Sequence, residues 1–143
     1  MILLDTNVVS EFMRPLPGPE VQSWISSQPP AALFISAVTE AELRLGLELL
    51  PPGKRRDGLE AALESMLAQD FADRILPFDR AAATAFAKIV AERRKLGRPI
   101  AQFDAQIASI ARCRGASLAT RNIADFTDCG IQVINPWRDK PSP

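Results

Sequence analysis

The sequence contains no histidine and no tyrosine, and only two cysteines among its 143 residues. The missing imidazole excludes Ser-His-Asp and Cys-His triads, paired-histidine nuclease chemistry, HExxH zinc proteases and two-Cys two-His zinc fingers. Cys113 and Cys129 have no spacing typical of a metal or redox motif, so we expect reduced structural thiols in a cytoplasmic protein. Any chemistry must therefore use carboxylates, hydroxyls, lysine or a bound ion.

Long apolar runs are missing too. No stretch approaches the roughly 18 residues that a membrane-spanning helix needs, and we expect no membrane association. The start of the chain has no basic segment and reaches an acid at Asp5, which predicts no secretory signal. A chain of this length favours a single domain with a proper core. We place that domain at residues 1–139 and expect a flexible tail at 140–143.

Five short apolar runs alternate with segments of helical periodicity. The strand candidates are residues 2–4, 33–35, 75–78, 117–119 and 131–134. Apolar residues at helical spacing occur over 59–71, 82–90 and 103–111, and a further helix is predicted to start at Pro19. This alternation predicts an α/β protein in which helices cover both faces of a mostly parallel sheet.

The equal numbers of basic and acidic residues, 17 of each, conceal an uneven distribution along the chain. Between Lys88 and Arg121 there are eight basic and two acidic residues, so this stretch carries a net charge of +6 and the remainder −6. One interpretation is a basic rim for a polyanion. The other is that cations at the ends of two helices complement the helix dipoles.

Asp5 directly follows the first apolar run and precedes a helix that is predicted to begin at Thr6 or Asn7. Ligands of open parallel sheets bind outside the carboxyl ends of the strands, so Asp5 would place a carboxylate in the expected site. An Asp at such a junction is equally often the N-cap of the helix.

Two further acids lie within apolar helix faces. Glu42 belongs to a helix predicted to begin near Ala37, and the residues stacked with it are Val38, Leu45, Gly46 and Leu49. Asp104 shares its face with small apolar residues. One acid of this kind is usually a salt-bridged residue at the edge of the apolar stripe. Two of them, together with Asp5 at a strand end, favour a shared site.

The turn after the fourth predicted strand supplies more polar groups at the same edge of the sheet. Thr120, Asn122 and Asp125 are either ordinary turn residues or groups that line a site. Carboxylates that converge in a low-dielectric cleft repel one another unless a cation neutralises them. Without histidine the ligands would all be oxygen, which suits Mg²⁺ or Mn²⁺ and disfavours zinc. Such an ion can activate a water molecule for attack on a phosphodiester.

Taken together, these segments resemble PIN-domain ribonucleases, in particular the VapC-type toxins of bacterial toxin–antitoxin pairs and their FitB branch. The resemblance rests on the order and spacing of MILLDTNVVSE, ISAVTEAELRLGL, RILPFD, FDAQIASIARCRG, LATRNIADF and INPW. It implies a three-layer α/β/α fold with about five strands and a Mg²⁺- or Mn²⁺-dependent endonuclease that leaves a 5′-phosphate on cleaved RNA. It also implies homodimerisation, inhibition by a cognate VapB- or FitA-like antitoxin in a higher assembly, and contact with DNA only through that antitoxin.

The resemblance assigns roles residue by residue. Asp5, Glu42 and Asp104 match the family's first three acids, so it implies that they are catalytic and bind the metal. Members of the family carry the fourth acid either at the position of Asn122 or three residues later. We place it on Asp125. The groups expected to line the site are Thr6, Asn7, Thr120 and Asn122.

An acidic metal pocket needs bases around it to hold phosphates, so the basic stretch becomes a candidate RNA-binding surface. Its predicted contacts are Arg93, Arg94, Lys95, Arg98 and Arg121. The alternative is a non-catalytic module that holds the cation structurally and acts through its antitoxin. A phosphotransfer domain fits less well, because the DTN motif lacks the second acid of a DxD pair and no lysine follows the later strands.

Overall fold

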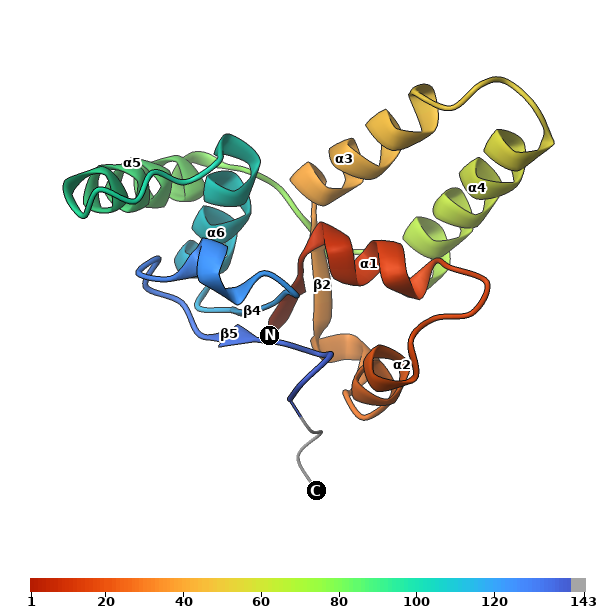
Figure 1. The fold of residues 1–143 in the computed structure, drawn as a ribbon, viewed down its shortest axis with the longest axis horizontal. Coiled ribbons are helices and arrows are strands. Elements are labelled where there is room, and N and C mark those ends of the chain that lie inside the picture. The colour runs from red at the N-terminus through yellow and green to blue at the C-terminus, as the bar shows by residue number, and fades with distance from the viewer. Residues whose placement is uncertain (140–143) are drawn as a thin grey trace.

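The structure is a computed structural model, and it describes residues 1–139. The predicted flexible tail at 140–143 lies outside the described residues. Five strands form one sheet near the middle of the molecule (Figure 1). They are β1 (Ile2–Leu4), β2 (Leu33–Ser36), β3 (Ile75–Leu76), β4 (Ser117–Ala119) and β5 (Val133–Ile134).

All neighbouring strands are parallel, in the order β3-β2-β1-β4-β5. The central strand β1 pairs with β2 through Ile2 and Leu33 and with β4 through Leu3 and Leu118. The strand predicted over 75–78 is shorter than expected, since Pro77 follows it directly and cannot donate a ladder hydrogen bond. The predicted α/β class with a parallel sheet is confirmed.

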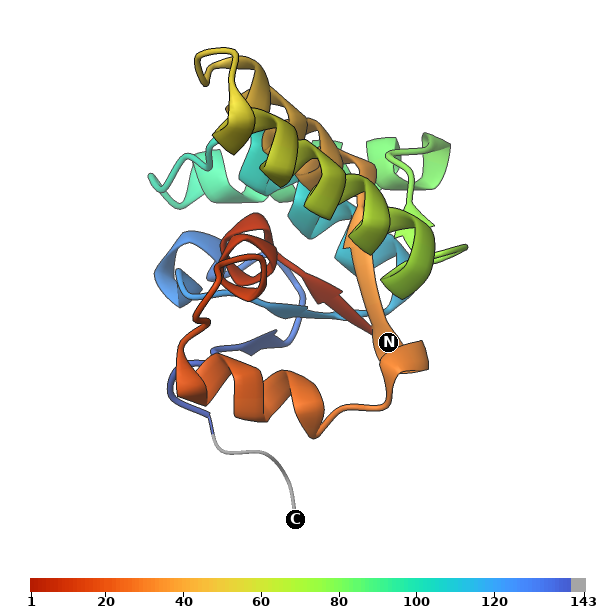
Figure 2. The ribbon, with the colours of Figure 1, turned by 90° about the vertical axis from the view of Figure 1, so that its right-hand side faces the viewer.

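Six α-helices connect and cover the strands, and Figure 2 shows them above and below the sheet. They are α1 (Thr6–Phe12), α2 (Pro19–Ser26), α3 (Ala37–Glu48), α4 (Lys54–Ser65), α5 (Arg80–Lys95) and α6 (Gln102–Arg114). The helical segment predicted over 59–71 ends in a π-turn, η2 (Met66–Asp70), and the shorter turns η1 (Pro30–Ala32) and η3 (Ile123–Phe126) are 3₁₀. No helix within residues 1–139 combines the length and apolarity needed to cross a membrane.

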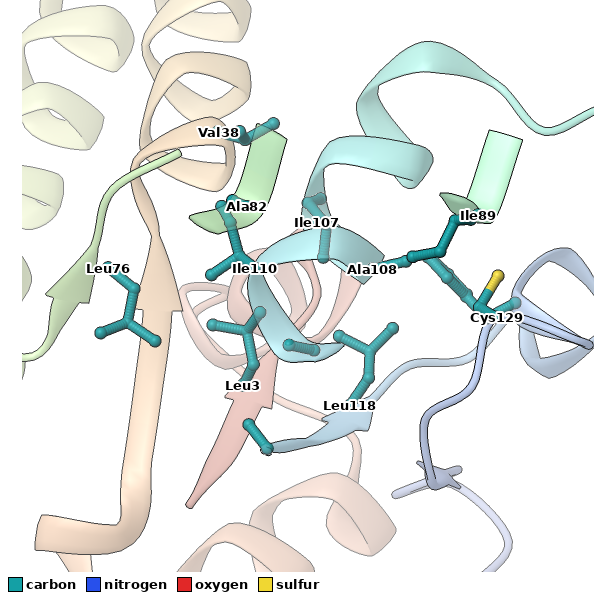
Figure 3. Packing of buried hydrophobic residues seen from close by; sticks show 13 residues of the cluster. Leu3, Val38, Leu76, Ala82, Ile89, Ile107, Ala108, Ile110, Leu118 and Cys129 are labelled. Atoms are coloured by element: carbon teal, nitrogen blue, oxygen red, sulfur yellow. The ribbon is translucent and has the colours of Figure 1, made fainter. Parts of the chain in front are cut away.

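The alternation of side chains along the strands divides the core into two halves. Leu3 and Leu118 face α5 and α6, where they meet Ile107 and Ile110 (Figure 3). The opposite faces of the same strands carry residues such as Leu4, which packs with residues of α1, α2 and α4. Three layers, helix on sheet on helix, are the result, as the resemblance implied.

Two helices begin immediately after a strand, and each is capped by the polar side chain at that junction. Asp5 caps α1 and Ser36 caps α3, each accepting a hydrogen bond from a backbone N–H of the first turn. Since parallel strands all end at the same edge, these capping residues and the helix starts gather there. That edge carries the candidate site.

The apolar stripe predicted around Glu42 is mostly exposed. Val38 is buried, whereas Leu45 is 51% and Leu49 77% exposed, and the side of α3 that packs on the core instead carries Leu43 and Leu47. Helical spacing indicates which residues share a face, but not whether another element covers that face. Glu42 therefore lies at the border between core and solvent and is not enclosed by apolar side chains.

Candidate active site

A cleft of about 500 Å³ lies at the carboxyl edge of the sheet. Its walls come from the start of α1, the middle of α3, the first turn of α6 and the turn that follows β4. The lining residues are Asp5, Thr6, Asn7, Ser10, Glu11, Arg14, Glu42, Asp104 and Asn122. Three of the four predicted acids thus share one cleft, although they are separated by up to about a hundred residues in the chain.

Asp5 is buried at the end of β1, and both of its carboxylate oxygens accept hydrogen bonds. Its backbone N–H donates to the carbonyl of Ala119 (2.9 Å), which extends the pairing of β1 with β4 by one residue. Oδ1 accepts from the N–H of Thr6 (2.8 Å) and Oδ2 from the hydroxyl of Thr120 (2.7 Å). Burial raises the pKa of Asp5, and these two hydrogen bonds oppose the rise. Asp5 is at once a helix cap and a wall of the cleft.

Thr120 is fully buried and links the end of β4 to α1. Its hydroxyl donates to Asp5 and accepts from the N–H of Asn122 (3.1 Å) and from Nδ2 of Asn7 (3.4 Å). Asn7 in turn accepts from the N–H of Arg121 (3.3 Å). The two predicted site-lining residues Asn7 and Thr120 therefore fix the turn after β4 against the start of α1.

Glu42 is held by a chain of hydroxyl groups. The hydroxyl of Thr6 donates to Oε1 of Glu42 (2.8 Å) and lies 3.0 Å from the hydroxyl of Thr39. Since Thr6 has a single hydroxyl proton, Thr39 must donate to Thr6, and the hydroxyl of Ser36 then donates to Thr39 (3.4 Å). Every proton in the chain points toward Glu42. This arrangement orients the carboxylate.

Asp104 lies in the first turn of α6 and shows the strongest electrostatic effect in the cleft. Burial, followed by the charges of Asp5, Asp125 and Glu42, raises its pKa to about 6, while Arg93 acts in the opposite direction. A carboxylate whose pKa rises because of other carboxylates lies in their field. All four acids predicted from the sequence are therefore electrostatically coupled.

The fourth acid predicted from the sequence could correspond to the position of Asn122 or to Asp125, and the two residues lie in different places. Asn122 lines the cleft, whereas Asp125 lies in η3 beside it with an exposed side chain. The charge of Asp125 nevertheless raises the pKa of both Asp104 and Asp5. Asn122 thus belongs to the wall, and Asp125 is the fourth acid within electrostatic reach.

Three lining residues were not predicted from the sequence. Ser10, Glu11 and Arg14 continue the face of α1 that begins with Asn7, at spacings of three, four and seven residues. That polar stripe can be seen in the sequence as polar residues at helical spacing after Asn7. Glu11 accepts from the N–H of Gly18 (2.9 Å) and pairs with Arg14 (3.2 Å), and these contacts lower its pKa. Its role is to hold the segment after α1.

Comparison with known proteins places this arrangement in a family. The model of the PIN domain matches residues 2–128. The chain belongs to the PIN-domain family. Within it the chain is a VapC- and FitB-like toxin of a toxin–antitoxin system, as its relatives show.

Three curated relatives of this PIN domain match over nearly their whole lengths. The chain is 45% identical over 137 residues to plasmid stability protein StbB of Pseudomonas syringae pv. tomato, covering 96% of this chain and 99% of that protein. It is 41% identical to VapC ribonuclease Y4jK of Sinorhizobium fredii, with 96% and 98% covered. It is 42% identical to toxin FitB of Neisseria gonorrhoeae, with 97% and 100% covered.

A solved structure of FitAB bound to an IR36 DNA fragment is similar to this PIN domain throughout. The TM-score is 0.91 at 40% identity, and the alignment covers 98% of each chain. Backbone and sequence therefore agree on the PIN-domain architecture over the whole described chain.

The basic residues of the PIN domain are not all available to a ligand. Arg93 is only 5% exposed, and its guanidinium donates to backbone carbonyls. The structure does not favour the predicted contact of Arg93 with RNA, because the guanidinium is buried and its Nε and Nη1 already donate to carbonyls. Arg94 and Lys95, the next residues of α5, are exposed.

Two other predicted RNA contacts are exposed but already engaged. Arg98 forms an ion pair with Asp128. The guanidinium of Arg121 stacks over the ring of Trp137, 5.0 Å from its centroid. Such surface contacts are weak enough to exchange for a phosphate, so both residues stay in the predicted set.

The donor set of the PIN domain fits a hard divalent cation in type. Carboxylate and hydroxyl oxygens surround the cleft, and the pKa of Asp104 is raised first by burial and then by the charges of the other acids. Within residues 1–139, no three acidic or thiol side chains already form an arrangement that could hold a metal ion.

Proposed function

We propose that the chain is a metal-dependent endoribonuclease, the toxin of a toxin–antitoxin module, that hydrolyses phosphodiester bonds in RNA. The observation that carries this proposal is the gathering of four acids at one sheet edge, with the pKa of Asp104 raised by burial and by the other three. Such crowding lowers the stability of the fold, and acids with perturbed pKa values of this kind are common at functional sites. The relative at 41% identity is itself named a VapC ribonuclease.

Asp5 and Asp104 are the proposed principal ligands of Mg²⁺ or Mn²⁺, and Glu42 and Asp125 complete the site directly or through water. When bound, such an ion would supply the positive charge that favours deprotonation of water and offsets the charge developing on the phosphate. An octahedral ion held by one or two carboxylates keeps several waters, which suits an open, water-filled cleft.

The chain's own groups fix the reacting geometry. Thr120 holds Asp5, and Thr6 holds Glu42, so neither carboxylate has to be ordered when RNA enters. Attack of water on phosphorus forms the new P–O bond while the bond from phosphorus to O3′ breaks. A proton from the water ends on O3′, and the products carry a 5′-phosphate and a 3′-hydroxyl.

Exposed cations beside the cleft would hold the RNA backbone. We assign this role to Arg94, Lys95, Arg98 and Arg121, without Arg93. Phosphate contacts of this kind release counterions, so binding weakens as the salt concentration rises.

Replacing Arg94 and Lys95 together by glutamine should weaken RNA binding and flatten its salt dependence. If both contact phosphates, the slope of log K against log salt falls by about 1.4 for single-stranded RNA. The measurement is a salt titration of RNA binding in the cleavage-deficient Asp104→Asn background. The double substitution of Lys54 and Arg55 by glutamine, on α4, is the matched control and should leave the slope unchanged. An unchanged slope in the α5 variant would place the RNA contacts elsewhere.

For partners, we propose homodimerisation and capture by a FitA- or VapB-like antitoxin, through which alone the protein contacts DNA. The support is the similarity to a FitAB structure that is bound to a DNA fragment.

A growth measurement tests whether the chain acts as a toxin in a bacterial cell. Induced expression of the wild-type chain in a bacterium should arrest growth, and the Asp104→Asn variant, expressed to the same level, should not. Co-expression of the cognate antitoxin should restore growth. Equal arrest by both chains would favour the alternative, a non-catalytic metal-binding module that acts through its partner.

A further inference from the structure

Arg93 is a buried cation that forms no ion pair, although its charge reaches Asp104 and lowers the pKa of that carboxyl. Among residues 1–139 it is the one lysine or arginine that is buried, and none of the ion pairs in this part of the chain includes it. Burying a charge without a counter-charge is costly unless its hydrogen-bond donors are well satisfied. The neighbouring Arg94 is exposed, so the burial of Arg93 is specific to its side of α5.

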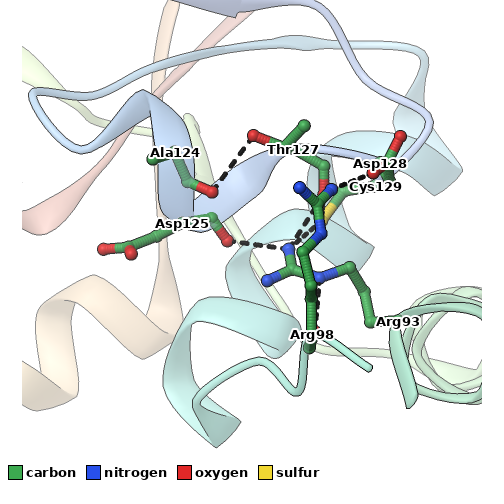
Figure 4. A network of polar contacts seen from close by, with 7 residues as sticks. All are labelled: Arg93, Arg98, Ala124, Asp125, Thr127, Asp128 and Cys129. Atoms are coloured by element: carbon green, nitrogen blue, oxygen red, sulfur yellow. Dashed lines mark hydrogen bonds and ion pairs between the residues drawn. The ribbon is translucent and has the colours of Figure 1, made fainter. Parts of the chain in front are cut away.

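Nε and Nη1 of Arg93 donate to backbone groups of two different segments (Figure 4). Nε donates to the carbonyl of Arg98 (2.7 Å). Nη1 donates to the carbonyls of Asp125 and Thr127 (2.9 Å each) and lies 3.6 Å from the sulfur of Cys129. A guanidinium is planar and rigid, so these contacts fix the two segments relative to each other.

One segment leads to a carboxylate in the cleft and the other to a carboxylate beside it. Arg98 lies in the connection from α5 to α6, and Asp104 is the third residue of α6. Asp125 belongs to η3, a single 3₁₀ turn. Figure 4 shows its carbonyl directed at Arg93 and its carboxylate pointing the opposite way.

Apart from Arg93, the turn that carries Asp125 is anchored by the buried ring of Phe126 and by the ion pair of Asp128 with Arg98. The N–H of Asp125 donates to Asn122 (3.1 Å), and the N–H (3.5 Å) and hydroxyl (3.1 Å) of Thr127 donate to Ala124. The chain then passes through Asp128 in the left-handed region (φ 60°), which is unfavourable for a residue other than glycine. These contacts leave the backbone carbonyls of Asp125 and Thr127 to Arg93, whose guanidinium is the buried polar contact of this turn with the end of α5.

We propose that Arg93 is a positioning residue of the active site, which holds the segments bearing Asp104 and Asp125 at the distance that the acidic cluster requires. This inference rests on the proposed function, because that function explains why the acidic cluster must be held in place. Arg93, which the sequence predicted to bind RNA, is instead given a structural role that positions the acids. The guanidinium acts through backbone carbonyls and does not touch the substrate.

The test compares Arg93→Lys with Arg112→Lys. Lysine keeps the charge and the stem at position 93, but a single ammonium group cannot reproduce the fork that spans both segments. Arg112 is the matched control, a half-buried arginine of α6 that packs against Gly130 and pairs with Glu92 at 3.6 Å. Both variants lose a guanidinium from the same helix pair.

Two readouts are independent of RNA cleavage. In Arg93→Lys, amide hydrogen exchange over residues 122–128 should accelerate at least about 10-fold, and Mn²⁺ affinity measured by electron paramagnetic resonance should fall about 10- to 100-fold. Arg112→Lys should change neither by more than about twofold. Wild-type exchange together with wild-type Mn²⁺ affinity in Arg93→Lys would overturn the inference, whatever the protein does to RNA.

Cleavage kinetics separate positioning from simple destabilisation. Arg93→Lys should lower kcat by about 10- to 100-fold with KM within about twofold, whereas loss of an RNA contact would raise KM. If the wild-type protein cleaves no RNA, the proposed function fails, and exchange and Mn²⁺ affinity still decide the role of Arg93. If Arg93→Lys does not fold, the wild-type protein decides it: the hydrogen-bonded amides of Asp125 and Thr127 should be protected from exchange, and exchange at the rate of an unstructured segment would contradict the proposal.

Discussion

Replacing Asp104 by asparagine is expected to abolish RNA cleavage and, at the same time, to stabilise the metal-free protein. Activity should fall by at least about 10³-fold, because a negatively charged group that would bind the cation and stabilise the transition state is lost. Stability should rise because burial and three neighbouring acids raise the pKa of Asp104 to about 6, so its charge is unfavourable at neutral pH. Allowing for partial solvent screening, we expect a gain of about 1 to 2 kcal/mol at pH 7.5.

The matched control for this substitution is Glu40→Gln. Glu40 is an acid in the first turn of its own helix, α3, as Asp104 is in α6, but it pairs with Arg44 at 2.7 Å outside the cleft. Its neutralisation should leave cleavage unchanged and should not increase stability. Urea unfolding and single-turnover cleavage of a labelled RNA measure the two quantities on the same preparations. Cleavage that survives in Asp104→Asn would remove this residue from the catalytic group.

Asp5→Asn should lose as much activity as Asp104→Asn without the gain in stability. The carboxylate of Asp5 accepts from both the N–H of Thr6 and the hydroxyl of Thr120. An amide can accept only on one side and would direct its NH₂ group at the other donor. Thr120 already accepts two hydrogen bonds, so it cannot easily reverse its own. The contrast between the two variants distinguishes relief of repulsion from a general effect of neutralising an acid.

The second large effect is a dependence of stability on pH that a divalent cation removes. The pKa of Asp104 is about 6 in the folded protein and has an ordinary value of 3.8. Between these values the folded state binds more protons than the unfolded state, so the metal-free protein loses stability as the pH rises from about 4 to 6. Above pH 6 the loss is complete. Mg²⁺ should therefore stabilise the protein strongly at pH 7.5 and weakly at pH 4.5.

The size of this effect follows from mass action. A ligand at about 100 times its dissociation constant adds roughly 2.7 kcal/mol, which raises the melting temperature of a domain of this size by about 5 to 10 °C. Thermal unfolding at both pH values, with MgCl₂ or with NaCl at equal ionic strength, measures it. Because the pKa of Asp5 is also raised and that of Glu11 is lowered, the difference between the wild type and Asp104→Asn isolates the contribution of Asp104. Equal stabilisation of both proteins by Mg²⁺ would contradict the proposed site.

Local sequence patterns predicted most of what positions the site. The apolar run before Asp5, the start of α3 after Ser36 and the strand before Thr120 depend on short-range signals, namely hydrophobicity, N-cap chemistry and strand length. Parallel strands then bring their ends to one edge, so the placement of Asp5, Glu42 and Asp104 in a common cleft follows from the fold class.

Features of the site that depend on contacts between distant parts of the chain could not be predicted from local sequence patterns. Arg93 looked like an exposed member of a basic run, because its burial depends on carbonyls more than 30 residues later in the chain. The spacing of Leu45 and Leu49 indicated a shared face with Glu42, but the exposure of that face depends on where α4 packs. The choice between Asn122 and Asp125 depends on the path of a 3₁₀ turn, which sequence periodicity does not encode.

The most direct test of the proposed function is cleavage of a labelled RNA by the purified protein with Mg²⁺ or Mn²⁺, repeated with a chelator, with each product's end groups identified. The account predicts cleavage with either metal, 5′-phosphate ends, no cleavage with the chelator, and no cleavage by Asp5→Asn or Asp104→Asn under any of these conditions. Cleavage that persists in the chelator, or in both variants, would contradict it.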